Sequence, residues 1–523
     1  MSARLARPTP DSPLSTPQKH QRTPACQIHE TSPTKDHEMT DDFTTAPSPE
    51  SVGIPSGAIL RFLERIDSER IHMHGFLLVR HGQVAAEGYW APWTAQRKHR
   101  MYSVTKSFVS LAVGLMIDEG RLSLDERVAD HFPDRLPEPL HPWVAAHTVR
   151  DLLRMSTAHS RTSYGRDDPD WVATFFHKAP SHPPGTLFYY DTAATVVLTA
   201  IVEQLAGEPF LDYMRPRFLN RIGFSEDAWC IRRPEGGSWG GSGLICTLRD
   251  LAKVAWTCMK HGGWDDEQLL PEDYVRTATS PQIDNAIRGQ HGYGYQIWCD
   301  PEGGFSMRGM GSQYAIAFPE RDFLFTCNAD TQGAPSGTAI PQLMREELLP
   351  HVADAPLPAD PATQVALREK IEGLASVPLP GAPTSPVVSQ ASGTWYDLED
   401  NPMGIKRMRL IFDGDQGTWE YTRSQSDHTL RFGIGCTMTG TFPQRNYFGE
   451  QIGVASGSEY ECLASAAWVD DKTLNMEVLL TDIHLGGLRM SIAFDDDRIG
   501  VYMTKQAEWF LDEYVGFAGG KVG

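Results

Sequence analysis

The sequence predicts two folded domains, a mixed α/β domain followed by an antiparallel β domain. The 523 residues exceed the usual length of one domain, so two domains with additional tails are expected. Helix-like and strand-like patterns are mixed between residues 51 and 350, whereas strands follow one another from about residue 391. Apolar residues make up 41% of the chain, which is enough to supply a core for each domain.

Residues 1–50 are expected to form a disordered tail. They are rich in Pro, Thr, Ser and His and show almost no apolar periodicity. No apolar stretch follows Arg4 and Arg7, so a secretory signal is not expected. A mitochondrial transit peptide is a weaker alternative, because the prolines of this tail disfavour the amphipathic helix that such a peptide needs.

The expected α/β domain, residues 51–350, opens with a helix and a hairpin. In IPSGAILRFLERID the apolar residues recur at helical spacing, and FLLVRHGQVAAEGYW has two short apolar runs around His81-Gly82. A long apolar helix is expected from Ser103 to Gly120. Further along, LRDLAKVAWTCMKHGG is expected to be helical, with a capping box of Thr247 and Asp250 at its start. GYGYQIW and QYAIAFPERDFLFTCNAD are typical of strands.

Residues 351–390 are expected to form a helix and a Pro-rich linker, and residues 391–523 an antiparallel β barrel or sandwich. The stretch VPLPGAPTSPVVSQ supplies the linker. After it, MRLIFDGDQGTWEYTR, YECLASAAWVDDKTLNMEVLL and LRMSIAFDDDRIGVYMTK each show two strands around a polar turn. Successive strands with few helices are typical of a barrel or a sandwich.

Charge and cysteine content narrow the class of protein. A net charge of -20 and a pI near 5.3 argue against nucleic acid and anionic membrane surfaces as partners, and no apolar run is long enough to span a membrane. The eight cysteines include no CxxC pair, so we expect reduced thiols in a cytoplasmic protein rather than a zinc site or disulfides. His72 and His74 lack a third ligand at a suitable spacing, and no metal or other cofactor is predicted.

Ser103 and Lys106 form the candidate catalytic pair. Residues three positions apart on a helix share a face, and here they stand at the start of a helix that is apolar on all sides and therefore buried. Burial lowers the pKa of a lysine, so Lys106 can take the proton of the Ser103 hydroxyl. Ser32 and Lys35 have the same spacing, but no apolar run follows them.

Two further segments complete the candidate site. In PGTLFYYDT, a Pro-Gly turn presents Tyr190 before an apolar helix, so its hydroxyl is a candidate to relay a proton to the leaving group. In SMRGMGSQ, glycines flank a strand edge and let a backbone N–H approach a substrate oxygen closely. Gly309, Met310 and Gly311 are the candidates that would complete an oxyanion hole with the N–H of Ser103.

Taken in order, these segments resemble the serine β-lactamase and penicillin-binding-protein superfamily, most of all its esterase and 6-aminohexanoate-dimer hydrolase branch. SVTKSF resembles the Ser-x-x-Lys motif, PGTLFYYDT the Pro-Gly-x-x-Phe-x-Tyr-x-Asn segment, and GGSGLICTLRDLAK and DLLRMSTAH two further family segments. The resemblance covers about residues 51–350 and implies an antiparallel sheet flanked by helices, with an all-helical subdomain. It also implies an acyl-enzyme on Ser103, with Lys106 and Tyr190 sharing the role of the base.

The sequence departs from the family pattern at two places. Asp191 and Thr192 stand where the family usually has Ser and Asn, and Met307-Arg308-Gly309 replaces Lys-Thr-Gly. Asp191, Thr192 and Arg308 are the candidates for contacts with the substrate. The Thr192 hydroxyl can still donate one hydrogen bond, and Arg308 is a candidate to replace the missing positive charge. These departures favour hydrolysis of a small-molecule ester or amide over antibiotic hydrolysis. A peptide-like or lactam substrate and a homo-oligomeric state stay open.

Other interpretations fit parts of the sequence. The altered motifs would also fit a catalytically inactive scaffold or sensor that keeps the fold. The segment from Gly236 to Gly240 fits Gly-x-Ser-x-Gly, but it lacks the buried strand before it and the helix after it that a nucleophile elbow needs. His147 and His159 are candidates to line a pocket.

Overall fold

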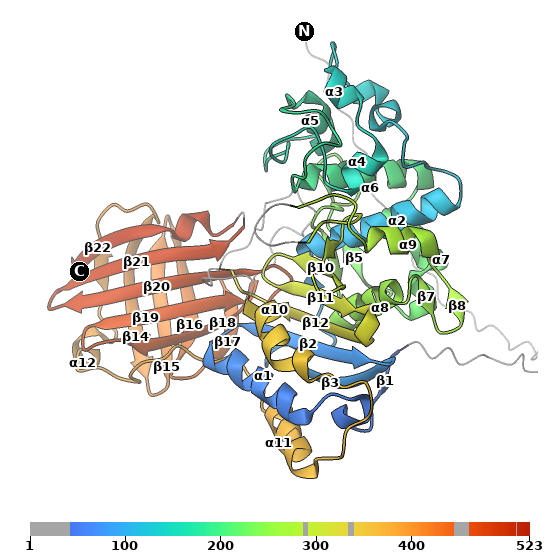
Figure 1. Cartoon of the computed structure of the whole chain (residues 1–523). Helices are drawn as coiled ribbons and strands as arrows, with labels where there is room; N and C mark the ends of the chain where they lie inside the picture. Colours follow the sequence, from blue (N-terminus) through green and yellow to red (C-terminus); the bar gives the residue numbers. More distant parts are fainter. Residues whose placement is uncertain (1–41, 286–290, 333–338, 444–459, 509) are drawn as a thin grey trace, which may run out of the picture. The chain divides into compact units, whose positions relative to one another are not determined.

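The computed structural model describes residues 42–285, 291–332, 339–443, 460–508 and 510–523 (Figure 1). A mixed α/β domain with a seven-stranded sheet is followed by a C-terminal β barrel. The predicted fold class is therefore confirmed. The tail predicted for residues 1–50 falls outside the described residues as far as residue 41.

The central sheet joins segments from both ends of the α/β domain. Its neighbouring strands are antiparallel, except that β1 is parallel to β3. The predicted turn of the β2–β3 hairpin is present, with positive φ at His81 (53°) and Gly82 (73°), which suits the twist of the two strands. In spatial order the strands are β1 (Thr44–Thr45), β3 (Gln83–Tyr89), β2 (Met73–Arg80), β12 (Phe323–Ala329), β11 (Gln313–Phe318), β10 (Phe305–Gly309) and β9 (Trp298–Cys299).

The side chains of β2 alternate between two cores. Leu77 and Val79 belong to the core that contains α8 (Leu248–Met259), whereas Phe76 and Leu78 belong to the core that contains α1 (Ser56–Ser68). Successive residues of a strand point to opposite faces, so a sheet with helices on both faces buries every residue of such a strand.

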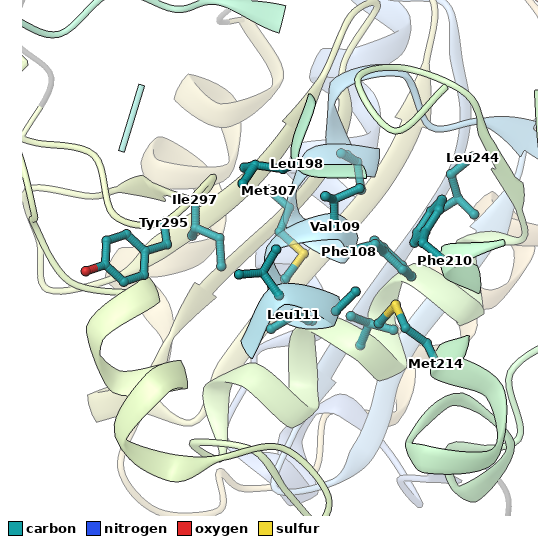
Figure 2. Close-up of a cluster of buried hydrophobic side chains, with 14 of the residues drawn as sticks. Phe108, Val109, Leu111, Leu198, Phe210, Met214, Leu244, Tyr295, Ile297 and Met307 are labelled. Atoms are coloured by element: carbon teal, nitrogen blue, oxygen red, sulfur yellow. The ribbon is translucent and has the colours of Figure 1, made fainter. Parts of the chain in front are cut away.

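Helix α2 (Thr105–Asp118) runs through the larger core, as its apolar composition predicts. A short 3₁₀ turn, η2 (Tyr102–Val104), comes first, so the regular helix begins two residues after Ser103. Figure 2 shows side chains of α2 packed among those of α6 (Thr192–Ala206), α7 (Phe210–Arg217), β6 (Leu244–Cys246) and β10. Each buried Leu or Phe contributes about 1.5–3 kcal/mol relative to exposure, so this packing fixes the position of the helix. The labelled residues are Phe108, Val109, Leu111, Leu198, Phe210, Met214, Leu244, Tyr295, Ile297 and Met307.

Most of the described α-helices lie between β4 (His99–Arg100) and β9. The predicted capping box is confirmed at the start of α8, where the Thr247 hydroxyl accepts from the Asp250 N–H (3.1 Å) and the Asp250 carboxylate accepts from the Thr247 N–H (2.9 Å). The other elements are η3 (Val128–His131), η4 (Pro133–Arg135), α3 (Pro142–Ala145), α4 (Val149–Leu153), α5 (Trp171–His177), η5 (Leu219–Ile222), β5 (Trp229–Cys230), β7 (Gly263–Trp264), β8 (Glu267–Gln268) and α9 (Glu272–Ala278).

The C-terminal domain is a barrel rather than a sandwich, because its sheet closes on itself. Neighbouring strands are antiparallel, and a parallel pairing of β16 with β18 closes the ring. Among the described strands, β17 pairs with β18 alone. Trp419, Trp468 and other inward side chains fill its core. The strands are β13 (Tyr396–Leu398), β14 (Ile405–Asp413), β15 (Gln416–Arg423), β16 (Ser426–Ile434), β17 (Met438–Phe442), β18 (Tyr460–Trp468), β19 (Thr473–Leu480), β20 (Gly486–Asp495), β21 (Arg498–Ala507) and β22 (Gly516–Val522).

Regular structure extends beyond the α/β boundaries expected from the sequence. Strand β1 lies within the expected tail, and α11 (Pro361–Glu372) of the expected linker packs against α1 and buries Leu367. The boundaries at residues 50/51, 350/351 and 390/391 stay predictions. The remaining elements are η1 (Pro49–Val52), α10 (Ala339–Leu343), the π-helix η7 (Met344–Leu348), η8 (Leu349–His351), α12 (Val388–Ala391) and η10 (Asp512–Tyr514).

Within the described ranges, no single helix has the length and apolar character to cross a membrane, although α6 and α7, bent by 63°, satisfy both measures when taken together.

Candidate active site

Ser103 lies at the start of α2, where three elements meet. Strand β4 pairs with β6, and the Met101 N–H donates to the Leu244 carbonyl oxygen at 2.7 Å, which fixes the backbone just before Ser103. Tyr102 has a positive φ of 46°, an uncommon conformation for a bulky residue. The Ser103 side chain is half-buried, while its neighbours on both sides are buried.

Lys106 lies beside the Ser103 hydroxyl. Its Nζ is 2.8 Å from Ser103 Oγ, and it donates to the Gly241 carbonyl oxygen at 2.6 Å. Only 1% of Lys106 is exposed, and burial is the main cause that lowers its pKa to about 7. A substantial fraction of this amine is therefore neutral near pH 7, and a neutral amine can accept a proton.

Tyr190 completes a group of three side chains. The Ser103 side chain is near enough to act on the pKa of the Tyr190 phenol, and the Lys106 ammonium lies 5.0 Å from the centre of its ring. The ring stacks on Trp298 at 5.4 Å between centroids and 21° between planes. Burial raises the pKa of Tyr190 to about 12, with the Ser103 hydrogen bond and the Arg308 charge opposing the shift, so the phenol keeps its proton near neutral pH.

The end of β10 approaches the Ser103 segment closely. A Cβ added at Gly309 would lie 2.3 Å from the Met101 carbonyl oxygen, so only glycine allows this approach. Gly311 has a φ of 73°, and Met310 lies half-buried between the two glycines. The predicted glycine pattern therefore brings the backbone at the end of β10 beside the residue two positions before Ser103.

Arg308 lies at the same edge of the sheet. Its guanidinium is 5.2 Å from the ring centre of Trp298, and its Nε donates to Ser306 Oγ at 2.7 Å. Burial lowers the pKa of Arg308, and its charge in turn acts on the Tyr190 phenol. The structure thus brings a positive charge to the Tyr190–Trp298 pair.

Asp191 has a different position from the one expected of a substrate contact. Its fully buried carboxylate caps α6 by accepting from the Ala193 N–H (3.0 Å), and it accepts from the Thr157 hydroxyl (3.0 Å). Its charge raises the pKa of Lys106, so it acts on the site electrostatically. Thr192 packs against Gly241, since a Cβ added at Gly241 would lie 2.5 Å from Thr192 Cγ2.

Three residues of this region were missed by the sequence reasoning. The Gly241 carbonyl oxygen accepts a hydrogen bond from Lys106, the Trp298 ring stacks on the Tyr190 ring, and Arg100 lies buried beside Tyr102. Gly241 belongs to the GGSG segment, whose resemblance to the family could have indicated it. Trp298 and Arg100 carry no comparable signal, because only tertiary packing brings them here.

The serine of the Gly-x-Ser-x-Gly segment and two of the candidate histidines each make other contacts in the structure. Ser238 is 5% exposed, and its N–H donates to the Glu203 carboxylate at 3.0 Å, in a loop without the strand and helix of an elbow. His74 stacks on Trp93 at 3.8 Å, and His147 Nδ1 contacts the Val144 carbonyl oxygen at 2.8 Å. In the part of the chain that the structure describes, no group of three or more His, Cys, Asp or Glu side chains is placed to hold a metal ion.

Comparison with known proteins identifies the family. The Beta-lactamase family model matches residues 62–349, which is more than half of the chain, so the chain belongs to the Beta-lactamase family. The resemblance expected from the motifs is therefore confirmed.

Individual relatives are distant. The 6-aminohexanoate-dimer hydrolase of Paenarthrobacter ureafaciens is 24% identical over 260 residues, a match that covers 45% of this chain and 66% of that protein, just under two thirds of its length. The octameric penicillin-binding protein homologue from Pyrococcus abyssi is 15% identical, with 89% of this chain and 99% of that chain covered and a TM-score of 0.47. The D-amino acid amidase from Ochrobactrum anthropi is 17% identical, with 52% and 90% covered and a TM-score of 0.41.

Proposed function

We propose that the chain is a serine hydrolase that cleaves a carboxylic ester or amide through an acyl-enzyme on Ser103. The observation that carries this proposal is the 2.8 Å separation of Lys106 Nζ and Ser103 Oγ, with the amine buried. A serine hydroxyl is a weak nucleophile until a base takes its proton, and a buried lysine can be that base.

In the first step, Ser103 Oγ bonds to the substrate carbonyl carbon while Lys106 takes the hydroxyl proton. The carbonyl electron pair moves onto its oxygen, and the N–H groups of Ser103 and Met310 are the proposed donors to that oxyanion. When the electron pair returns, the bond to the leaving group breaks and the Tyr190 phenol supplies the proton that the leaving oxygen or nitrogen needs. Water then attacks the ester on Ser103, and the same groups return the protons.

The substrate is proposed to be a small molecule with an ester or an amide bond. A relative is named a hydrolase of the 6-aminohexanoate dimer, which supports the class of reaction but not the identity of the acyl group. The absence of lysine from Met307-Arg308-Gly309 argues against a lactam antibiotic as the main substrate. Arg308 would favour a substrate with negative charge or a polar group near the leaving side.

Acylation of Ser103 tests the proposal directly. The intact protein is treated with a fluorophosphonate probe or a p-nitrophenyl ester, and the mass of the adduct is measured and mapped to a peptide. We expect one adduct on Ser103, which Ser103→Ala abolishes. Ser238→Ala is the matched control, because Ser238 is the serine of the rival Gly-x-Ser-x-Gly segment and its loss should leave labelling intact.

The inactive-scaffold alternative has its own outcome in this experiment. If the folded protein forms no adduct with ester, amide or lactam probes, the hydrolase proposal is rejected in favour of a scaffold or sensor. An adduct that disappears in Ser238→Ala rather than in Ser103→Ala would place the nucleophile elsewhere.

A further inference from the structure

The C-terminal barrel contacts the residues directly before Ser103. The Arg100 N–H donates to the Ile483 carbonyl oxygen at 3.1 Å, and the Leu485 N–H donates to the Tyr102 hydroxyl at 2.8 Å. Both barrel residues lie in the loop between β19 and β20. A Cβ added at Gly311 would lie 2.1 Å from Leu485 Cδ1, so the same loop also reaches the end of the third motif.

Arg100 is a buried cation whose carboxylate partner belongs to the barrel domain. Its side chain has no exposed surface, and its guanidinium lies 4.3 Å from the ring centre of Tyr102 and 4.5 Å from that of Trp239. Arg100 Nη1 is 3.4 Å from the Glu508 carboxylate, just after β21. Removing the carboxylate leaves a buried guanidinium with less compensation for its charge, so Glu508 helps to hold Arg100 in position.

Arg100 and Lys106 are held by neighbouring residues. Arg100 Nε donates to the Ser242 carbonyl oxygen (2.8 Å) and Nη2 to Ser242 Oγ (3.1 Å), while Lys106 donates to the carbonyl oxygen of Gly241 (2.6 Å). A displacement of Arg100 would therefore move the Gly241–Ser242 segment and the amine that it holds. This chain of contacts links the barrel to the Ser103 hydroxyl.

We propose that Glu508 of the C-terminal barrel is a positioning residue for the hydrolase site, because its ion pair with Arg100 fixes the segment that holds Lys106 beside Ser103. The barrel is thereby part of the catalytic unit rather than an independent appendage. This inference rests on the proposed function, since it concerns the base of that reaction.

The charges around Lys106 predict how removal of the Glu508 charge would change the pKa of Lys106. Lys106 faces Glu508 from the barrel, Asp191 from the start of α6, Arg100 from β4 and the Tyr190 phenol, while Arg308 acts on that phenol. Burial and then Arg100 lower the pKa of Lys106, whereas Glu508 and Asp191 raise it. Glu508 also acts on the phenols of Tyr102 and Tyr164, whose pKa values stay above the ordinary range.

Glu508→Gln is the informative variant. It keeps the size of the side chain and removes the charge, so of the two carboxylates that raise the pKa of Lys106 only Asp191 still opposes Arg100. We expect the acid limb of the kcat/KM profile to move to lower pH by on the order of one unit, and kcat/KM at the plateau to fall about tenfold or more. A merely structural role would lower the plateau without moving the limb.

Glu461→Gln is the matched control. Glu461 of β18 pairs with Arg97, so this variant also removes an ion pair between the barrel and the segment before Ser103, but Glu461 is 61% exposed and does not act on Lys106. Its pH profile should superimpose on that of the unmodified chain. Glu508→Asp keeps the charge but shortens the side chain, and should fall between the unmodified chain and Glu508→Gln.

A second readout separates this inference from the proposed function. Competitive acetylation with acetic anhydride, followed by peptide mass spectrometry, measures the titration of Lys106 whether or not the chain turns over a substrate. A lower titration midpoint in Glu508→Gln supports the inference even if no substrate is found. Unchanged midpoints in both Glu508 variants, measured in folded protein, would overturn the inference. Absence of Ser103 acylation in the unmodified chain would overturn only the proposed function. If Glu508→Gln does not fold, Glu508→Asp decides by the same criterion.

Discussion

Lys106 donates a hydrogen bond to the carbonyl oxygen of Gly241, a residue 135 positions further along the chain. This contact fixes the amine at the point where α2 meets the GGSG segment. A lysine has several rotatable bonds, so an acceptor at 2.6 Å that is itself held by packing is what keeps Nζ beside Ser103 Oγ. The geometry of the pair thus depends on a contact between segments distant in sequence.

Replacement of Lys106 by arginine tests the role of the base. A guanidinium keeps its proton at any accessible pH, so Lys106→Arg should lower kcat/KM by about 10²–10⁴ while the fold is retained. The measurement is turnover of a p-nitrophenyl ester together with a thermal melt. Lys260→Arg is the control, because Lys260 is a half-exposed lysine of the same domain. Turnover near that of the unmodified chain in Lys106→Arg would remove this lysine from the role of base.

The pH dependence of acylation follows from the lowered pKa of Lys106. Below about pH 7 the amine is protonated and cannot accept the Ser103 proton, so the rate should rise with pH through about 7 and then level off. The measurement is kcat/KM from about pH 5 to about pH 9. A rate that still rises at the upper end of this range without levelling off, as expected for the ordinary lysine value of 10.5, would contradict a buried, neutral Lys106.

Tyr190→Phe should affect poor leaving groups most. The variant keeps the ring that stacks on Trp298 and removes only the hydroxyl, whose pKa the Ser103 side chain lowers. p-Nitrophenolate leaves without a proton, so its ester should lose little activity, whereas an alkyl ester or an amide should lose about 10²-fold or more. Equal losses for both kinds of substrate would mean that Tyr190 does not protonate the leaving group.

Gly309→Ala should disrupt the site through the backbone. The added methyl group would lie 2.3 Å from the Met101 carbonyl oxygen, so β10 or the Ser103 segment must move, and we expect a loss of about 1–3 kcal/mol in the free energy of unfolding and a large loss of acylation. Chemical denaturation and probe labelling measure the two effects. Gly440→Ala is the control, because nothing lies within 4 Å of a Cβ added there. A Gly309→Ala protein as active and stable as the control would contradict the close approach.

The sequence by itself determined the elements whose signal is local. The all-apolar run after Ser103 predicted a buried helix, because such a helix has no face that tolerates water, and Thr247 with Asp250 predicted the cap that the structure shows. The motifs also predicted the family that the Beta-lactamase match confirms. Spacing along a helix already placed Ser103 and Lys106 on one face.

Only the tertiary structure decided which distant groups reach that face. Asp191 looked like a substrate contact in the sequence, yet it caps α6 because its carboxylate lies at the Ncap position. Arg100 and Glu508 have no local pattern that marks them, because their proximity arises when a short strand of the α/β domain and a separate barrel pack together. Local spacing encodes periodicity within one element, whereas electrostatic partners between elements depend on the packing of the whole chain.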